Sequence, residues 1–242
     1  MADDKSQTKS KTESKTPAPY SSRAEIDAFI ETARDIAALR GAGGKGRLIF
    51  ALDATISRQP TWEMASVIQA DMFREAAAIG GLDIQLLYYR GFGECRASNW
   101  VSDGDTLAAL MRRIDCREGL TQIGKALSHA RQETSKSKVS AVVFVGDAVE
   151  ESPDELCGNA GELGLCGVPV FVFQEGDDAS AAGVFRKIAA LSNGAYCRFS
   201  PGSAKELADL LRAVAAYAAG GLAALEAAEP TSGTRKLLEQ LR

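Results

Sequence analysis

Short apolar runs separated by helical patterns constrain this chain more than any other feature of its sequence. Three of these runs, LIFAL at 48–52, AVVFV at 141–145 and VPVFVF at 168–173, contain no charged residue. Strands that are apolar on both faces are typical of parallel sheets covered by helices on both sides. The alternation of strands and helices therefore predicts an α/β fold with a doubly wound, mostly parallel sheet and helices on both faces.

The expected elements follow one another along the chain with one irregularity. Two strands come in succession around the GFG of residues 91–93, and this pattern predicts a hairpin and one antiparallel edge strand. The predicted strands are 47–53, 83–89, 94–100, 139–146, 168–174 and 195–199, and the predicted helices are 61–79, 105–114, 122–133, 153–163, 179–191 and 204–217.

The pattern divides the chain into four segments. Residues 1–21 are rich in Lys, Ser, Thr and Asp, so we expect a disordered tail. Residues 22–40 carry apolar side chains at helical spacing and predict an N-terminal helix, which a Gly-rich linker separates from the first strand. We expect the α/β domain at 46–218 and a helical C-terminal extension at 219–242, to which the sequence assigns no role.

The charge and cysteine content exclude several classes of function. The net charge is −4, which argues against nonspecific binding to nucleic acid. No apolar run approaches the roughly 20 residues of a membrane span, and the N-terminus lacks the apolar segment of a signal peptide. The five cysteines form no C-x-x-C pair. We therefore expect a cytoplasmic protein with free thiols.

Oxygen-bearing side chains follow the predicted strands where ligands gather in doubly wound sheets, at the carboxyl ends. The first strand runs into Asp53, Thr55 and Ser57, a D-x-T-x-S turn whose alternate side chains can converge. Asp147 follows the strand AVVFVG, and Thr121 precedes the helix expected from residue 122. Two carboxylates and three hydroxyls suit a hard cation such as Mg²⁺ or Mn²⁺.

These motifs resemble the metal-ion-dependent adhesion site of von Willebrand factor type A domains, including the cytosolic members found in bacteria, over about residues 46–218. The resemblance implies that Thr55, Ser57 and Thr121 contact the metal, while Asp53 and Asp147 complete its shell. It further implies a binding module or adaptor, not an enzyme, in which a partner protein supplies an Asp or Glu to the metal. Ala148 departs from the family, which often has Gly after its last Asp.

Two other functions stay open at this point. A Mg²⁺-dependent phosphohydrolase of the haloacid dehalogenase type also places an Asp after its first strand, but it uses D-x-D, and here Thr55 stands where the second Asp belongs. In a metal-free scaffold, residues 53–57 would only cap the following helix, because Asp, Ser and Thr are common helix caps.

Four further residues have two interpretations each, and a fifth has one. Glu150 and Glu151 either lie on the rim of the metal site or respond to the dipole of the helix that follows them. Arg58 and Trp62 either border a docking surface or pack against a surface helix. His129 is the only histidine and is expected to be structural.

Overall fold

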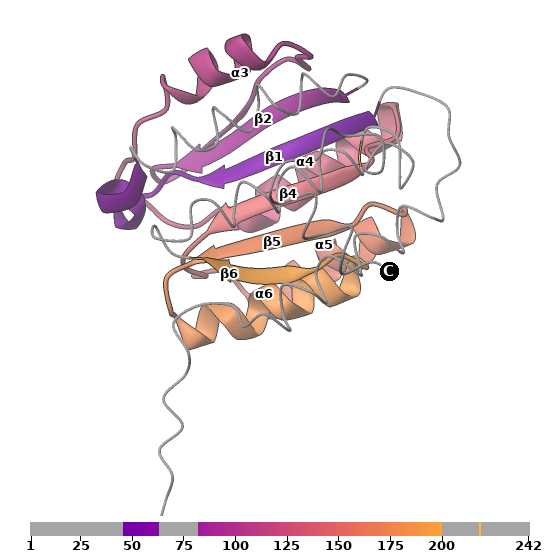
Figure 1. Cartoon of the computed structure of the whole chain (residues 1–242). Helices are drawn as coiled ribbons and strands as arrows, with labels where there is room; N and C mark the ends of the chain where they lie inside the picture. Colours follow the sequence, from indigo (N-terminus) through magenta and orange to yellow (C-terminus); the bar gives the residue numbers. More distant parts are fainter. Residues whose placement is uncertain (1–45, 63–81, 200–217, 219–242) are drawn as a thin grey trace, which may run out of the picture.

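A computed structural model describes residues 46–62, 82–199 and 218 of the 242-residue chain. Its centre is one six-stranded sheet with the strand order β3-β2-β1-β4-β5-β6 (Figure 1). The strands are β1 (Gly46–Asp53), β2 (Leu82–Arg90), β3 (Glu94–Ala97), β4 (Ala141–Gly146), β5 (Val170–Glu175) and β6 (Tyr196–Phe199).

The described helices lie between these strands along the chain. They are η1 (Ile56–Arg58), α3 (Gly104–Met111), α4 (Ile123–Lys136), α5 (Pro153–Leu165) and α6 (Ala179–Leu191). Each lies within three residues of an expected helix at either end, except the short 3-10 helix η1, which the sequence did not predict. Residues 59–62 are helical as well, so the helix expected from residue 61 begins earlier.

The sheet is parallel except at one edge. β2 pairs with β1, β1 with β4, β4 with β5 and β5 with β6, all in parallel, whereas β2 and β3 are antiparallel. The chain winds outward from β1 in one direction to β3 and in the other to β6. This topology confirms the expected doubly wound sheet with one antiparallel edge strand.

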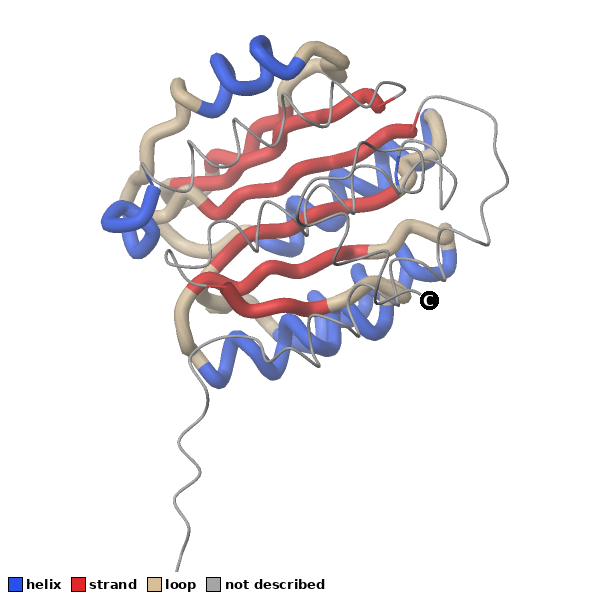
Figure 2. Tube along the Cα trace, in the orientation of Figure 1, coloured by secondary structure: helices blue, strands red, loops and turns tan. Residues whose placement is uncertain are grey.

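Described helices pack on both faces of the sheet: α4, α5 and α6 lie along one face, and α3 packs on the other, near β2 (Figure 2). On one face, Leu48 and Phe50 of β1 belong to a buried cluster with Leu107 of α3. On the other face, Ile49 of β1 belongs to a second cluster with residues of α4, α5 and α6, such as Phe185. Successive residues of β1 therefore enter opposite cores, which explains why residues 48–52 are all apolar.

The β2–β3 hairpin confirms the expected turn, but its second strand is shorter than predicted. Gly91 has a φ of 62°, the left-handed conformation that glycine tolerates. β3 ends at Ala97 instead of residue 100. There, Leu86 donates its backbone N–H to the hydroxyl oxygen of Ser98 at 3.0 Å, so a side chain replaces the backbone partner and interrupts the regular ladder.

Several expectations lie outside the described residues. These are the tail at 1–21, the helix at 22–40, most of the helix at 61–79, the helix at 204–217 and the extension at 219–242. Among the helices that the structure does describe, none combines the length and apolar character needed to cross a bilayer.

Candidate metal centre

Two carboxylates lie at the carboxyl ends of neighbouring strands. Asp53 is the last residue of β1, and Asp147 directly follows β4, which pairs with β1 in parallel. Gly146 allows the close approach: a Cβ there would lie 3.5 Å from the Cβ of Asp53 and 2.7 Å from the ring of Phe144. The end of β4 is thus packed against the first carboxylate of the predicted site.

The turn after β1 links its three predicted ligands by hydrogen bonds. Oδ1 of Asp53 accepts from the backbone N–H of Thr55 at 2.8 Å and from the Thr55 hydroxyl at 2.6 Å. The Thr55 hydroxyl lies 3.1 Å from that of Ser57, within hydrogen-bond distance. The alternate spacing in D-x-T-x-S therefore places three oxygen-bearing side chains in one continuous chain of contacts.

Tyr89 of β2 is a member of the site that sequence reasoning missed. Its hydroxyl donates to Oδ2 of Asp53 at 2.9 Å, and both side chains are fully buried. In the parallel register of β1 and β2, the two residues are direct partners. Tyr89 is the penultimate residue of β2, and it lies opposite Asp53 only through the register between the two strands, which the sequence pattern does not fix.

The surroundings of Asp53 disfavour its charged form. Burial raises the pKa of the Asp53 carboxyl above its ordinary value, and the negative charge of Asp147 raises it as well. Hydrogen bonds from Thr55 and Tyr89 act in the opposite direction. A buried carboxylate and a partly buried one that repel each other gain most from a cation between them.

Asp147 has an unsatisfied oxygen. Its Oδ1 is buried and has no hydrogen-bond partner, and it is the one side-chain atom of this kind in the described part of the chain. A buried carboxylate oxygen without a partner is costly, and a bound ion is one of the groups that satisfy such an atom. A cation bound by Asp147 would satisfy it.

The loop before α4 carries Thr121 to the same edge through contacts with the loop after β4. The backbone N–H of Thr121 donates to Oε2 of Glu150 at 2.8 Å, and the backbone N–H of Glu150 donates to the hydroxyl of Thr121 at 3.0 Å. Thr121 is therefore tied to a residue only three positions beyond Asp147.

Glu151 strengthens the same connection. Its carboxylate accepts from the backbone N–H groups of Ile123 and Gly124, the first two residues of α4. Glu151 thus bonds the beginning of α4, and Glu150 bonds Thr121, two residues before that helix. This is a third arrangement beside the two that sequence reasoning considered, and it joins the two loops that carry Thr121 and Asp147.

Arg58 and Trp62 do not border an exposed docking surface. Arg58 is 1% exposed, and its guanidinium donates to Glu175 of β5 at 2.7 and 2.9 Å and to the backbone carbonyl of Asp53 at 3.0 Å. Trp62 is buried and donates to the carbonyl of Ile114. The docking expectation is wrong because Glu175 provides a buried countercharge, which draws the arginine inside.

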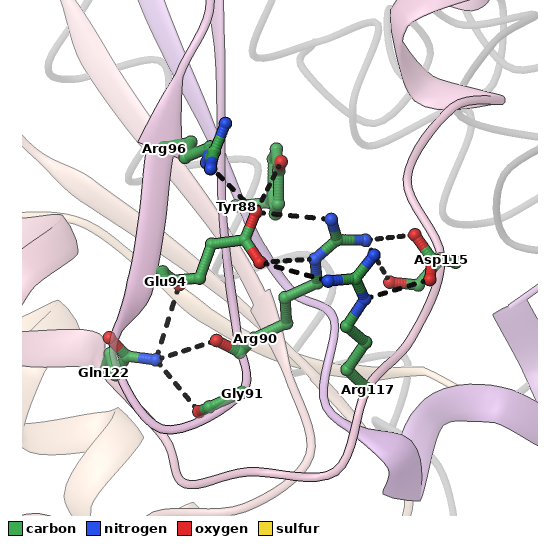
Figure 3. A network of polar contacts seen from close by, with 8 residues as sticks. All are labelled: Tyr88, Arg90, Gly91, Glu94, Arg96, Asp115, Arg117 and Gln122. Atoms are coloured by element: carbon green, nitrogen blue, oxygen red, sulfur yellow. Dashed lines mark hydrogen bonds and ion pairs between the residues drawn. The ribbon is translucent and has the colours of Figure 1, made fainter.

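A polar network fixes the hairpin beside the loop that carries Thr121 (Figure 3). Gln122 is buried and donates to the backbone carbonyls of Arg90 at 3.2 Å and Gly91 at 3.3 Å. The Arg90 side chain donates to Glu94 across the hairpin at 3.0 Å. Asp115 and Arg117 extend the network along the loop.

The residues present fit an oxygen-ligated divalent ion. The structure brings Asp53, Thr55 and Ser57 into contact, places Asp147 beside Asp53, and ties Thr121 to the loop of Asp147. No three His, Cys, Asp or Glu side chains gather as a metal site within the described ranges, so a cation would rely on hydroxyl oxygens as well. The single histidine, His129, is bonded to Gln85 instead.

The fold is that of von Willebrand factor type A domains, as comparison with solved structures shows. A von Willebrand factor type A protein from Catenulispora acidiphila matches with a TM-score of 0.59 and 17% identity, over 73% of this chain and 43% of that one. The VWA domain of SpRpn10 matches with a TM-score of 0.54 and 11% identity, over 71% of this chain and 94% of that one.

A third similar structure holds a metal in its own metal-ion-dependent adhesion site (MIDAS). It is proximal thread matrix protein 1 from the mussel byssus, described with a zinc-occupied MIDAS motif, with a TM-score of 0.57 and 15% identity, over 72% of this chain and 47% of that one. The chain thus spans less than half of the length of two of these three proteins. The sequence itself matches no protein-family model and no curated protein.

Proposed function

We propose that this chain, which has the von Willebrand factor type A fold, binds Mg²⁺ or Mn²⁺ and uses the ion to bind a partner protein. Asp53, Thr55, Ser57, Thr121 and Asp147 would hold the ion. The observation that carries the proposal is the buried Oδ1 of Asp147, which lacks a partner and lies beside the fully buried carboxylate of Asp53. A cation would satisfy the unpartnered oxygen and would reduce the repulsion between the two carboxylates.

The partner would contribute an acidic side chain. A hard cation favours an anionic oxygen over a further water, and three of the five proposed ligands are neutral hydroxyls. Solved structures with this fold support a binding role, since one of them is the pilus adhesin SpaC from Lactobacillus rhamnosus GG. We therefore propose an adaptor that binds an Asp or Glu side chain of another protein, and we assign no catalytic activity to it.

A thermal titration tests the metal. Mg²⁺ or Mn²⁺ at about ten times its Kd should add about 1.4 kcal/mol to the free energy of unfolding, a rise in Tm of about 3–6 °C for a chain of this size. Asp53→Ala and Asp147→Ala should abolish the rise. Relief of repulsion should raise the Tm of metal-free Asp147→Ala, whereas Asp53→Ala also loses the hydrogen bonds from Thr55 and Tyr89. An unchanged response in both variants would refute this site.

A pull-down tests the partner. Proteins captured in Mg²⁺ should be released by a chelator, and Thr121→Ala, which removes a hydroxyl without changing charge, should weaken their binding. Binding that survives chelation would favour a metal-free scaffold. The captured protein should also lose affinity when its own docking carboxylate is replaced by the amide.

The phosphohydrolase alternative fits the contacts of Asp53 less well. A nucleophilic carboxylate needs a free oxygen facing the substrate. Asp53 is fully buried, and its two oxygens accept from Thr55 and Tyr89. Turnover of a generic phosphate ester that is lost in Asp53→Asn would favour the enzyme over the adaptor.

A further inference from the structure

Three large apolar side chains project into solvent around the proposed metal site. Phe92 is 79% exposed, and Ile56 and Leu120 are each 51% exposed. Burying such side chains is favourable, so their exposure has a cost that the folded chain alone does not recover. We refer to Phe92, Ile56 and Leu120 as the apolar rim.

The rim residues come from three segments. Two of these segments carry proposed metal ligands, and the third contacts one of them. Ile56 stands between Thr55 and Ser57 in the turn after β1, and Leu120 directly precedes Thr121. Phe92 is the tip of the β2–β3 hairpin. The rim therefore frames the site on the side of β1 and β2.

Backbone contacts hold these segments together. The N–H of Leu120 donates to the carbonyl of Gly91 at 3.2 Å, next to Phe92. The N–H of Arg117 donates to the carbonyl of Ala54 at 3.0 Å, and Arg117 bridges to Thr55, next to Ile56. The loop that carries Leu120 thus lies against both the hairpin and the turn, and the three side chains belong to one surface.

The rest of the described surface offers no comparable group at this edge. Two other large apolar residues are strongly exposed in the described ranges, Leu165 and Leu191, at the ends of α5 and α6. A Cβ on Gly164 would lie 2.3 Å from the carbonyl of Leu191, so these two helix ends meet each other. Because the amino end of β5 follows α5 directly, Leu165 and Leu191 lie at the edge of the sheet opposite the metal site.

We infer that the apolar rim sets the specificity of the proposed metal-dependent docking, and that its occupant is a partner segment with an acidic residue flanked by apolar ones. The inference rests on the proposed function. A metal that accepts a carboxylate supplies the charge complementarity, and the rim supplies apolar contact beside it. An isolated acidic residue in a polar surface would leave the rim exposed and would bind more weakly.

The width of the surface limits the length of the motif. Neighbouring strands lie about 4.8 Å apart, so the ends of β2, β1 and β4 together span about 10 Å. An extended peptide covers about 3.3 Å per residue. The apolar partner residues should therefore lie within about three positions of the carboxylate.

Peptide selection tests this inference. A phage-displayed library of short random peptides is panned on the full chain in Mg²⁺ and eluted with a chelator. The expected sequences contain Asp or Glu with a Leu, Ile, Val, Phe or Trp within about three residues. Chelator-eluted peptides that carry an acid without any apolar preference would overturn the rim inference and leave the proposed function intact.

Rim variants complete the test. Phe92→Ser and Leu120→Ser should each weaken a selected peptide about tenfold or more, a loss of about 1.4 kcal/mol, because a few central apolar contacts carry most of the energy of an interface. Their Mg²⁺ affinity, measured without peptide, should stay that of the wild type. Leu165→Ser, at the opposite edge, is the matched control and should change neither quantity.

The remaining outcomes contradict the inference in distinguishable ways. Peptides retained equally with and without Mg²⁺ would refute both the rim inference and the proposed function. Sedimentation that shows Mg²⁺-dependent dimers, lost in Phe92→Ser, would assign the rim to a second copy of the chain instead. Wild-type peptide affinity in both Ser variants would show that the rim makes no contact.

Discussion

The hydroxyl of Tyr89 donates a 2.9 Å hydrogen bond to Oδ2 of Asp53, and both groups are buried at the carboxyl edge of the sheet. This bond stabilises the charged form of a carboxylate whose surroundings otherwise favour the neutral one. Tyr89 is therefore a positioning residue: it holds Asp53 in a fixed orientation and keeps it ionisable. Its effect on the proposed metal passes through that carboxylate.

Tyr89→Phe tests this relationship. Loss of a buried hydrogen bond to a charged group should lower the free energy of unfolding by about 1.5–3 kcal/mol in urea denaturation at neutral pH. Mg²⁺ affinity should fall more at low pH than at high pH, because protons compete better for the unsupported carboxylate. Tyr88→Phe, whose hydroxyl bonds the partly exposed Glu94, is the control and should cost less. Equal losses in both variants would contradict this role.

The raised pKa of Asp53 predicts how the stability of the metal-free protein depends on pH. Because the folded pKa lies above the unfolded value of about 3.9, the folded protein binds this proton more tightly than the unfolded chain does. The resulting destabilisation is absent below about pH 4 and grows as the pH rises through the raised pKa.

Asp53→Asn isolates this contribution. The amide retains an oxygen for the Thr55 donors but does not titrate, so the metal-free variant should lack the loss of stability that wild type shows above about pH 4. Urea unfolding at a series of pH values measures the difference between the two curves. Parallel curves across that range would mean that Asp53 titrates normally.

The buried ion pair of Arg58 and Glu175 stabilises the turn after β1. Arg58→Met should lower the free energy of unfolding by about 3–5 kcal/mol, because it leaves Glu175 without its countercharge in a buried place. Arg131→Met, which breaks the exposed pair with Glu162, should cost less than about 1 kcal/mol. Denaturant midpoints compare the two variants, and similar shifts would be incompatible with a structural role for Arg58.

Much of the fold could be predicted because the strands are buried on both faces. Apolar runs such as LIFAL predict parallel strands that helices cover on both faces. The Gly91–Gly93 turn predicts the antiparallel edge strand. The prediction of the end of β3 was wrong because a side chain there competes with the backbone for a hydrogen bond. Ser98 ends β3 early in this way, and no periodicity predicts it.

The candidate site was only partly predictable. The contacts among Asp53, Thr55 and Ser57 follow from spacing within one turn, and a position for Asp147 at the same edge follows from the fold class. Tyr89 could not be identified, because its contact depends on the register between two strands. The positions of Arg58 and Glu151 depend on partners far away in sequence, Glu175 and the start of α4.

Counting bound metal ions tests the central claim most directly. Free Mn²⁺ gives a sharp paramagnetic resonance signal that weakens when the ion binds protein, so a titration yields both stoichiometry and Kd. We predict one ion per chain, and a Kd at least about tenfold weaker in Asp147→Asn, where a charged ligand with an otherwise unsatisfied oxygen is lost. Asp154→Asn, in the exposed first turn of α5, should bind as wild type does. No saturable binding by the wild-type chain, or equal binding by Asp147→Asn, would contradict the account.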